Sequence, residues 1–459
     1  MGHFVGYDRT APMLLAPDMQ DWLVQKHLAR FIVEVIERMD LSAIEASYDG
    51  RGERAYHPKM LLALLVYGYA TGVFSSRKIE RACQDSIAFR YIAANVSPDH
   101  DTIADFRKRV LPELPKIFLH VLTVAREMEF LKLGEISLDG TKIKANASKH
   151  HALSYAHAGK IKAKLRREVA RLMKLAEAAD NERDPELNIP DEITRREEMI
   201  AKIDEARTKI EAREAQRHAE IKAKHAERLA QRKEPQRTTG KKPKGARPRM
   251  PARRVEPTAQ INLTDEESRI MPTADGFAQG FNAQAAVSIE SQFVVALSVT
   301  QATNDKQQLV PILRDLPALA PQLGVVTAIA ADAGYFSAGN VQACEEAGVV
   351  PLLAMRREAH HRWLDARLRK SALEPPPDAT PVERMAHRLQ TPDGRALYAK
   401  RKSTVETVFG NIKSAIGFRT FLLRGLENVG GEWSLVCSAY NIKHLHRMVA
   451  ACPNRAVAT

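Results

Sequence analysis

The stretch Glu135-Ile136-Ser137-Leu138-Asp139-Gly140-Thr141-Lys142-Ile143 is the point at which the pattern of the chain changes. Apolar residues alternate over this short run, whereas before it they recur at helical steps, so the run is predicted to form a β-strand. Asp139 lies in the later part of this strand, where an aspartate is costly unless it is paired, hydrogen-bonded or bound to a cation. A turn that starts at the Asp-Gly dipeptide is an equally good interpretation of this residue.

The chain before this strand is predicted to be helical. Asp18–Met39 and Lys59–Thr71 carry helical patterns, and short helices follow through Ile92 and again into Arg107. Gly72 is expected to end the second of these helices, because glycine readily adopts the left-handed conformation that follows a helix.

Basic residues on these helices allow two interpretations of residues 1–125. The side chains expected to be exposed are those of Arg77, Lys78, Arg81 and Arg107. They fit a helical module that docks on DNA, and they fit a purely structural bundle equally well. His57 and His100 lie next to a proline or a cap, which favours a capping or turn role over metal ligation.

A long insertion follows the first strand, at residues 158–257. Its arms, Ala158–Ala178 and Asp191–Gln231, are rich in helix-forming residues and predict an antiparallel helical hairpin that turns near Asn181–Pro190. The apolar seams consist of Leu165, Val169, Leu172, Met173 and Leu175 in the first arm and Ile193, Ile200, Ile203 and Ile210 in the second. Thr238–Arg249 is too rich in proline, glycine and charge to pack, and it is predicted to be a flexible basic loop.

Strand patterns return after the insertion and alternate with helices. The expected order is strand, strand, helix, strand, helix, strand over Gly280–Ile289, Phe293–Thr300, Lys306–Leu316, Gly324–Ala331, Ala338–Ala347 and Val349–Met355. Asn304-Asp305 is expected to cap the first of these helices. Asp332 follows a strand of the buried kind, and functional residues collect at such strand ends. We therefore favour a functional role for Asp332 over a simple helix cap.

The last helix expected in this order carries a carboxylate among cations. After a turn at Thr391–Arg395, the pattern of Tyr398–Lys413 predicts an amphipathic helix. Lys402, Glu406 and Lys413 project from nearly the same side of this helix. A carboxylate in such a setting suits a metal bound beside a phosphate backbone. The alternative is an ordinary solvated basic face with one salt bridge.

The charge of the chain points to a polyanionic partner. The net charge of its 459 residues is +13, which favours nucleic acid first and an acidic membrane second. The four cysteines are widely scattered and imply neither a metal-type pair nor a disulfide framework, as in a reducing cytoplasm. The N-terminal segment has no signal pattern, and no run reaches the roughly 18 apolar residues of a membrane span. We therefore expect a soluble intracellular protein with no membrane partner.

The order of elements from Asp139 onward resembles a ribonuclease H-like core, which is a mixed α/β fold. In such a core Asp139 would lie on the first strand, Asp332 at the end of the fourth and Glu406 on a late helix, so that the three carboxylates converge at one edge of the sheet. The expected organisation comprises an N-terminal all-α domain (1–125), a ribonuclease H-like catalytic domain (126–157 and 258–447), the inserted hairpin (158–257) and a C-terminal tail (448–459).

Motifs in the expected order resemble the bacterial DDE insertion-sequence transposases that carry a Tyr-Arg-Glu-Lys signature. The three catalytic blocks correspond to Leu138–Asn146, Ala331–Phe336 and the pattern Tyr398-x2-Arg401-x4-Glu406-x6-Lys413. Tyr56-His57-Pro58, Pro98–Arg107 and Asn262–Met271 resemble further blocks of the family. The spacing from Arg401 to Glu406 is one residue longer than in the simplest form of the signature, which leaves the role of Arg401 open.

This resemblance implies metal-dependent DNA cleavage and strand transfer at the ends of an insertion sequence. Asp139, Asp332 and Glu406 would be the catalytic residues and would bind two Mg²⁺ or Mn²⁺ ions. The implied DNA contacts are Tyr398, Arg401, Lys402 and Lys413. The partners would be double-stranded DNA, namely the terminal inverted repeats and the target, bound by a homodimer. The protein would act in the bacterial cytoplasm in association with the nucleoid.

Two other classes of function stay open on the sequence alone. The first is a repurposed transposase that binds DNA without cutting it, and the second is a coiled-coil scaffold built on the hairpin. Tyr398 also has two interpretations, since its ring can contact a terminal nucleotide or anchor the helix on which it lies.

Overall fold

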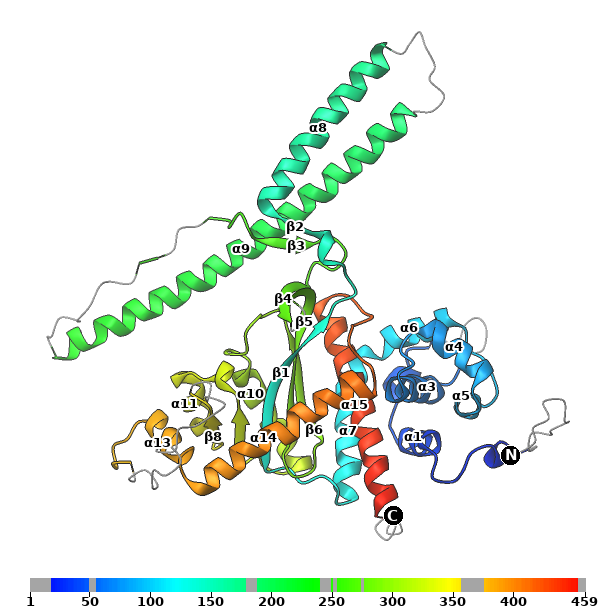
Figure 1. The fold of residues 1–459 in the computed structure, drawn as a ribbon, viewed down its shortest axis with the longest axis vertical. Helices are drawn as coiled ribbons and strands as arrows, with labels where there is room; N and C mark the ends of the chain where they lie inside the picture. The colour runs from blue at the N-terminus through cyan, green and yellow to red at the C-terminus, as the bar shows by residue number, and fades with distance from the viewer. Residues whose placement is uncertain are drawn as a thin grey trace, which may run out of the picture. The chain divides into compact units, whose positions relative to one another are not determined.

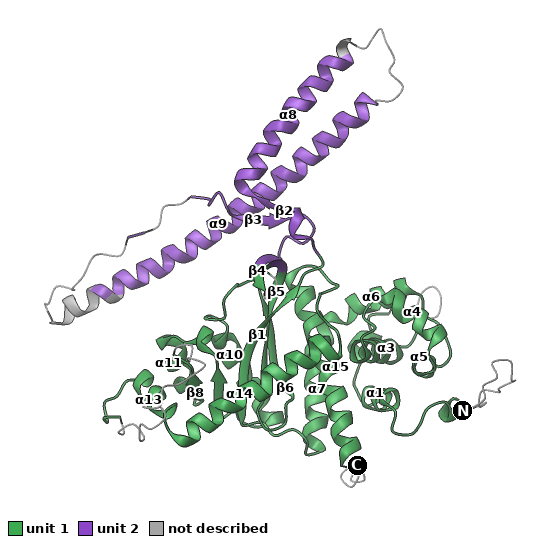
Figure 2. Ribbon diagram, viewed as in Figure 1, with its two compact units in different colours: residues 1–146, 271–276, 280–459 green, residues 147–270, 277–279 purple. Residues whose placement is uncertain are grey.

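The computed structural model describes residues 18–48, 55–178, 188–239, 249–250, 254–273, 276–355 and 375–452, and for residues 231 and 233–239 the backbone alone. The chain divides into two compact units (Figure 2). Unit 1 consists of residues 1–146, 271–276 and 280–459, and unit 2 consists of residues 147–270 and 277–279. The expected hairpin turn and the expected basic loop lie largely outside the described residues.

The first part of unit 1 consists of helices (Figure 1). They are η1 (Met19–Asp21), α1 (Leu28–Glu37), α2 (Ser42–Glu45), α3 (Pro58–Thr71), α4 (Ser76–Asp85), α5 (Ile87–Ile92), α6 (His100–Val110), η2 (Leu111–Glu113) and α7 (Leu114–Glu127). The prediction of one helix over Asp18–Met39 is wrong, because α1 begins only after the His27 ring, which accepts a hydrogen bond from the Ala29 N–H. Among the described residues no single helix has the length and apolar character of a membrane span, although α3 and α4 together, bent by 96°, pass on length and composition.

The ends of α3 agree with the sequence. His57 caps its first turn with a ring nitrogen, and Gly72, with a φ of 85°, ends it. These two roles confirm the predicted cap and stop. His100 is not a cap, because Asp99 caps α6 and the His100 ring contacts the Glu80 carboxylate at 2.9 Å instead.

Arg107 differs from the other basic residues of these helices. Arg77, Lys78 and Arg81 are exposed, as expected. Arg107 is only 5% exposed, and it donates a hydrogen bond to the Phe74 carbonyl at 2.7 Å. The expectation of an exposed Arg107 is therefore wrong.

Six strands form one mixed sheet among the described residues. They are β1 (Glu135–Lys144), β4 (Arg269–Thr273), β5 (Gly276–Ser288), β6 (Val294–Thr300), β7 (Ala328–Ala331) and β8 (Val350–Leu353). The order is β4-β5-β1-β7-β8, and β6 also pairs with β5. β5 is antiparallel to β1 and β6, whereas β7 is parallel to β1 and β8 is parallel to β7. The parallel strand β7 is buried along its whole length, which explains its unbroken apolar sequence.

Helices cover this sheet (Figure 1). They are α10 (Leu309–Leu323), α11 (Ala338–Glu346), α13 (Pro381–Arg388), α14 (Pro392–Gly410) with its π-helical continuation η6 (Asn411–Ala415), and α15 (Leu426–Ala451). α14 packs on β1 and β7, and α15 contacts β6, α3 and α7. The turn expected at Thr391–Arg395 is wrong, because the Thr391 hydroxyl caps α14 by accepting a hydrogen bond from the Gly394 N–H.

A buried carboxylate on α15 joins α3 to the chain that follows η6. Glu432 is 1% exposed, and one of its oxygens accepts a hydrogen bond from the Tyr69 hydroxyl at 2.7 Å. The other oxygen accepts hydrogen bonds from the N–H groups of Leu422 and Leu423 at 2.9 and 3.0 Å. Burial raises the pKa of Glu432, and these hydrogen bonds oppose that rise. The carboxylate is therefore buried with partners for both of its oxygens.

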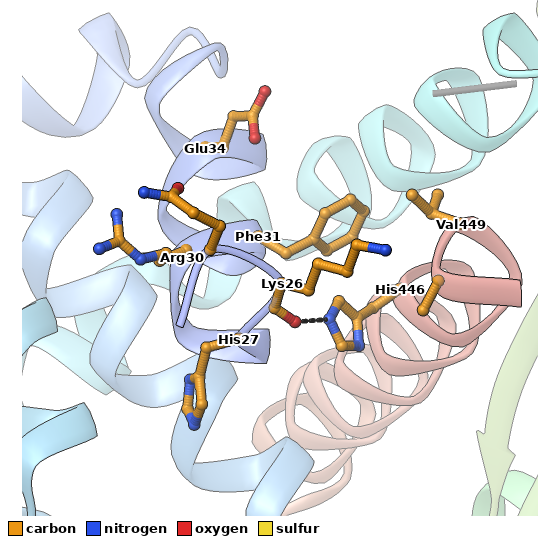
Figure 3. Close-up of a pocket in the computed structure, with 9 residues that line it drawn as sticks. Lys26, His27, Arg30, Phe31, Glu34, His446 and Val449 are labelled. Atoms are coloured by element: carbon orange, nitrogen blue, oxygen red, sulfur yellow. Dashed lines mark hydrogen bonds between the residues drawn. The ribbon is translucent and has the colours of Figure 1, made fainter. Parts of the chain in front are cut away.

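A pocket of about 240 Å³ lies where α1 meets the end of α15 (Figure 3). The His446 ring donates a hydrogen bond to the Lys26 carbonyl at 2.8 Å and lies 5.4 Å from the Phe31 ring. His446 near the end of α15 thus contacts Lys26 and Phe31 at the start of the N-terminal helices.

Unit 2 is a helical hairpin beside a small sheet, which confirms the predicted hairpin. It contains α8 (Tyr155–Ala178), α9 (Ile189–Thr239) and the antiparallel strands β2 (Ala152–Ser154) and β3 (Gln260–Asn262). α8 packs against α9. The buried residues of the predicted seams include Val169, Leu172, Ile203 and Ile210, whereas Met173 and Leu175 are 46% and 45% exposed. The seam of α8 is therefore narrower than its apolar composition suggests.

Candidate active site

Parallel pairing of two strands brings Asp139 and Asp332 to the same edge of the sheet. β1 and β7 pair with Leu138 opposite Ala331, and the two aspartates are the residues that follow this pair. Because both strands run in the same direction, both side chains lie where β7 ends. Two carboxylates that are distant in the sequence thus become neighbours.

Asp139 is partly buried among charges. Its side chain is 20% exposed, and its oxygens accept hydrogen bonds from the Gly140 N–H at 2.8 Å and from the Arg401 guanidinium at 3.1 Å. Burial raises the pKa of Asp139 to about 6, and the negative charges of Asp332 and Asp305 add to this rise, while Gly140 and Arg401 oppose it. The interpretation of Asp139 as the start of a turn is wrong, because β1 continues beyond Gly140.

Asp332 follows its strand directly and also caps the next turn. Its carboxylate accepts a hydrogen bond from the Gly334 N–H at 2.8 Å, at the start of the short 3₁₀ helix Ala333–Tyr335. The sequence left a functional role and a cap as alternatives. In the structure Asp332 lies at the end of β7 and also caps the 3₁₀ helix that follows. The capping hydrogen bond uses one carboxylate oxygen, so it does not exclude a functional role for the other.

Arg401 connects helix α14 to the first aspartate. Although it is charged, it is only 9% exposed. Its two terminal nitrogens donate hydrogen bonds to Asp139 and to Glu406, each at 3.1 Å. The Glu406 side chain is 50% exposed. One guanidinium therefore bridges a partly buried acid on β1 and a half-exposed acid on α14.

The other predicted contacts lie in different surroundings. Tyr398 is partly buried and packs against the apolar cluster of Ile289, Ala330 and Leu352. Lys402 is exposed on α14. Lys413 lies in the π-helical turn η6 and donates a hydrogen bond to the Lys142 carbonyl of β1 at 3.2 Å. π-helical turns often occur at functional sites.

Asp305 lies close enough to the site for its negative charge to help raise the pKa of Asp139, although the sequence pattern assigned it to a helix cap. That assignment is wrong, because α10 begins only at Leu309. The Asp305 carboxylate accepts hydrogen bonds from the side-chain amides of Asn282 and Gln284 at 2.6 and 2.7 Å. The amides of Asn282 and Gln284 within a buried strand are the sequence signal that was missed, because buried amides require a hydrogen-bond partner.

Two sequence families match this chain. The family described as Transposase domain (DUF772) matches residues 17–109, and the family described as Transposase DDE domain matches residues 208–442, just over half of the chain. The chain belongs to the DDE transposase family. It is therefore a transposase, an enzyme that cleaves DNA and transfers strands. No curated protein and no solved structure matches it.

The matched ranges contain two of the three acids expected from the sequence. Asp332 and Glu406 lie within the DDE match, whereas Asp139 lies between the two matched ranges. The case for Asp139 in this transposase is therefore geometric: it adjoins Asp332 through strand pairing and shares Arg401 with Glu406.

The chemistry of the site fits a hard divalent cation, as the family uses. Its carboxylates are Asp139, Asp305, Asp332 and Glu406, and its cations are Lys142, Arg401 and Lys413. Carboxylate oxygens are the ligands that Mg²⁺ and Mn²⁺ prefer. No three acidic, histidine or cysteine side chains among the described residues are arranged to hold one metal ion as they stand. Glu406 is held by Arg401 instead.

Without divalent cations, the contribution of Asp139 to the free energy of unfolding is expected to fall as the pH rises from about 4 to about 6. The folded chain keeps the Asp139 proton up to a pKa of about 6, against an ordinary value of 3.8, so protonation stabilises the folded state at low pH and this contribution is lost across the window. The fall from this group is up to about 3 kcal/mol, since one pKa unit corresponds to about 1.4 kcal/mol. Urea denaturation over a pH series with a chelator, in wild type and Asp139→Asn, measures it.

Added Mg²⁺ supplies the matching control at neutral pH. A cation that binds the ionised carboxylate should raise the stability of the wild type and leave Asp139→Asn nearly unchanged. If both proteins showed the same pH dependence with the chelator present, Asp139 would not be the titrating group.

Proposed function

We propose that unit 1 contains a ribonuclease H-like catalytic core whose acids are Asp139, Asp332 and Glu406. The observation that carries the proposal is the parallel pairing of β1 with β7, beside which both aspartates stand. The rest of the sheet supports it: β5 is antiparallel to β1, β6 is antiparallel to β5, and β8 lies parallel beyond β7.

In this proposal the three acids bind two Mg²⁺ or Mn²⁺ ions. When bound, such ions activate a water or a 3′-hydroxyl and stabilise charge on the leaving oxygen. The chain must then supply ionised Asp139 and a free Glu406 carboxylate. Since Glu406 is half exposed, its ion pair with Arg401 contributes little, and its exchange for a cation costs little.

The cations around the acids are proposed to hold DNA. Lys402 and Lys413 supply positive charge for transposon-end phosphates, which gives affinity and position rather than sequence information. Arg401 would hold a phosphate once Glu406 is released, and Tyr398 would contact a terminal nucleotide. Together Tyr398, Arg401, Glu406 and Lys413 make up the proposed Tyr-Arg-Glu-Lys signature.

The wider organisation is proposed on the same basis. We divide the transposase into an N-terminal all-α, DNA-binding domain (1–125), a catalytic domain (126–157 and 258–447), the inserted hairpin (158–257) and a C-terminal tail (448–459). A homodimer would bind the terminal inverted repeats and the target DNA. The proposed site of action is the nucleoid in a bacterial cytoplasm, where the DNA ends and the target would lie.

The proposal is tested with DNA taken from beside the gene. Inverted repeats that bracket the gene, with short direct repeats outside them, define the substrate. Purified transposase with a duplex that carries one such end and Mg²⁺ is expected to nick the end and to join it to target DNA. A chelator should stop both reactions. Gel separation of labelled strands measures both products.

The rival is a transposase that binds DNA but no longer cuts it. Specific binding of a verified end without metal-dependent cleavage, in both Mg²⁺ and Mn²⁺, would favour the rival and contradict the proposal. A scrambled end of the same length and composition is the control for specific binding.

A further inference from the structure

Helices α3 and α4 meet at nearly a right angle across a short turn. The chain bends by 96° between them, and the connection consists of the four residues 72–75. It begins with Gly72, whose φ of 85° is the left-handed conformation that ends α3. Two helices at about 90–120°, joined by a turn of three or four residues that contains glycine, are typical of a helix-turn-helix, whose second helix enters the major groove of DNA.

The turn between these helices is packed tightly against its surroundings. A Cβ on Gly68 would lie 2.6 Å from the Val73 carbonyl oxygen and 3.2 Å from the Ile79 side chain, so α3 needs a glycine where it meets the turn and α4. From α6, the buried Arg107 guanidinium donates a hydrogen bond to the Phe74 carbonyl at 2.7 Å. These contacts fix the direction of α4 relative to α3.

Helix α4 has one buried face and one exposed, basic face. Ile79 and Cys83 are buried, and the helix packs against α5 and α6. The exposed side chains of α4 are those of Arg77, Lys78, Arg81, Gln84 and Asp85. The helices α7 and α15 lie between α4 and the sheet (Figure 1). The basic face of α4 is therefore a surface separate from the proposed catalytic acids.

The spacing of these side chains suits contact with bases. Arg77, Arg81 and Gln84, at steps of four and three residues, form one row along the helix. Arginine and glutamine are the side chains that make paired hydrogen bonds to guanine and adenine in the major groove. Arg81 lies 3.1 Å from Asp85, but these side chains are 83% and 64% exposed, so the ion pair contributes little and can be exchanged for a base. Lys78 lies beside the row, as a phosphate contact requires.

We propose that α4 is the recognition helix of a helix-turn-helix and enters the major groove of the transposon end, where Arg77 and Arg81 contact bases and Lys78 contacts a phosphate. A helix with its side chains is about 10–12 Å across, which matches a groove about 12 Å wide. Arg77 and Arg81 are about 6 Å apart along the helix, so they contact base pairs about two apart. This inference rests on the proposed DNA-binding role of residues 1–125 and adds the groove and the residues that give specificity.

Binding to two duplexes tests the proposal without requiring cleavage. The probes are a fluorescent duplex that carries the transposon end and a scrambled duplex of the same length and composition, titrated by anisotropy with a chelator over a salt series. Arg77→Ala and Arg81→Ala should each weaken binding to the end by roughly 10-fold, and binding to the scrambled duplex much less. Lys78→Ala should weaken binding to both duplexes about equally and lower the slope of log K against log salt by about 1.

Substituted ends locate the contacts. When each base pair of the inverted repeat is replaced in turn, Arg81→Ala should no longer distinguish the wild-type base at one position. The corresponding position for Arg77→Ala should lie within about two base pairs of it. Replacing a contacted purine with its 7-deaza analogue removes only the N7 acceptor in the major groove. It should weaken binding by the wild type and not by the matching arginine variant.

The control is Arg38→Ala at the end of α1. The Arg38 side chain is 58% exposed, so this variant removes the same charge from the surface of the helical part and should keep the preference for the end. Thermal unfolding of every variant checks the fold.

Two results would overturn the proposal: Arg77→Ala and Arg81→Ala weaken binding to both duplexes equally, or they weaken neither. If such variants kept the full preference in a transposase that cuts the end, the assignment of α4 alone would fail. If the wild type preferred the end and the arginine variants lost that preference, but no protein cut the end in Mg²⁺, the catalytic proposal would fail and the assignment of α4 would stand.

Discussion

Replacing Asp139 with alanine is expected to reduce DNA cleavage and strand transfer by at least about 10³-fold. The substitution removes the carboxylate at the centre of the site, which adjoins Asp332 through strand pairing and Glu406 through Arg401. Asp332→Ala and Glu406→Ala should have effects of the same order, because each removes one of the proposed metal ligands. Single-turnover cleavage of a labelled transposon end in Mg²⁺ measures the loss, and anisotropy should show that DNA binding is retained.

Asp139→Asn separates this loss of activity from unfolding. Burial of the negative charge raises the pKa of Asp139, so the neutral amide should make the folded protein at least as stable at neutral pH without metal. Activity and stability should then change in opposite directions. The control is Asp315→Ala, since the Asp315 side chain is 58% exposed on α10. Full activity in any one of the three alanine variants would remove that residue from the proposed site.

Replacing Glu432 with alanine is expected to lower the free energy of unfolding by about 3 kcal/mol. The change removes the acceptor of the Tyr69 hydroxyl and of two backbone N–H groups, at Leu422 and Leu423, and leaves these donors buried without it. It also opens a cavity on α15, whose central residues are buried. Urea denaturation followed by circular dichroism measures the change.

Glu427→Ala is the matched control on the same helix. Glu427 is exposed in the first turn of α15, where a carboxylate contributes less than about 1 kcal/mol through the helix dipole. Equal losses in the two variants would show that the Glu432 hydrogen bonds add nothing to stability beyond an ordinary helix substitution.

Local sequence pattern was sufficient to predict a strand or helix where the secondary structure depends mainly on residues that are close in the sequence. The alternation of residues 135–143 identified β1, and the apolar run before Asp332 identified β7. The narrow seams identified the hairpin of α8 and α9. Boundaries were less certain where two local signals compete. Thr391–Arg395 contains turn-forming residues, yet it starts α14, because threonine followed by proline is also a helix start.

The burial and the contacts of a side chain could not be predicted from local sequence pattern where they depend on residues far away in the sequence. Arg107 was expected at the surface, but its guanidinium lies 5.7 Å from the Tyr69 ring, where it is buried. Asp305 was expected to cap α10, but its carboxylate accepts hydrogen bonds from two buried side-chain amides on β5 instead. Arginine usually lies at the surface and aspartate often caps a helix, but at both positions a contact that exists only in the folded chain outweighed this local preference.

The sequence by itself determined part of the elements of this transposase, among them β1, β7 and the hairpin of α8 and α9, because hydrophobic periods and strand-end residues are local properties. It did not predict α7, α15 or β4. Only the tertiary structure decided how the acids of the candidate site are connected. Arg401 meets Asp139 across 262 residues of sequence, and the two aspartates become neighbours through the register of β1 and β7. Register and long-range ion pairs arise from packing of the whole sheet, so no stretch of sequence contains them.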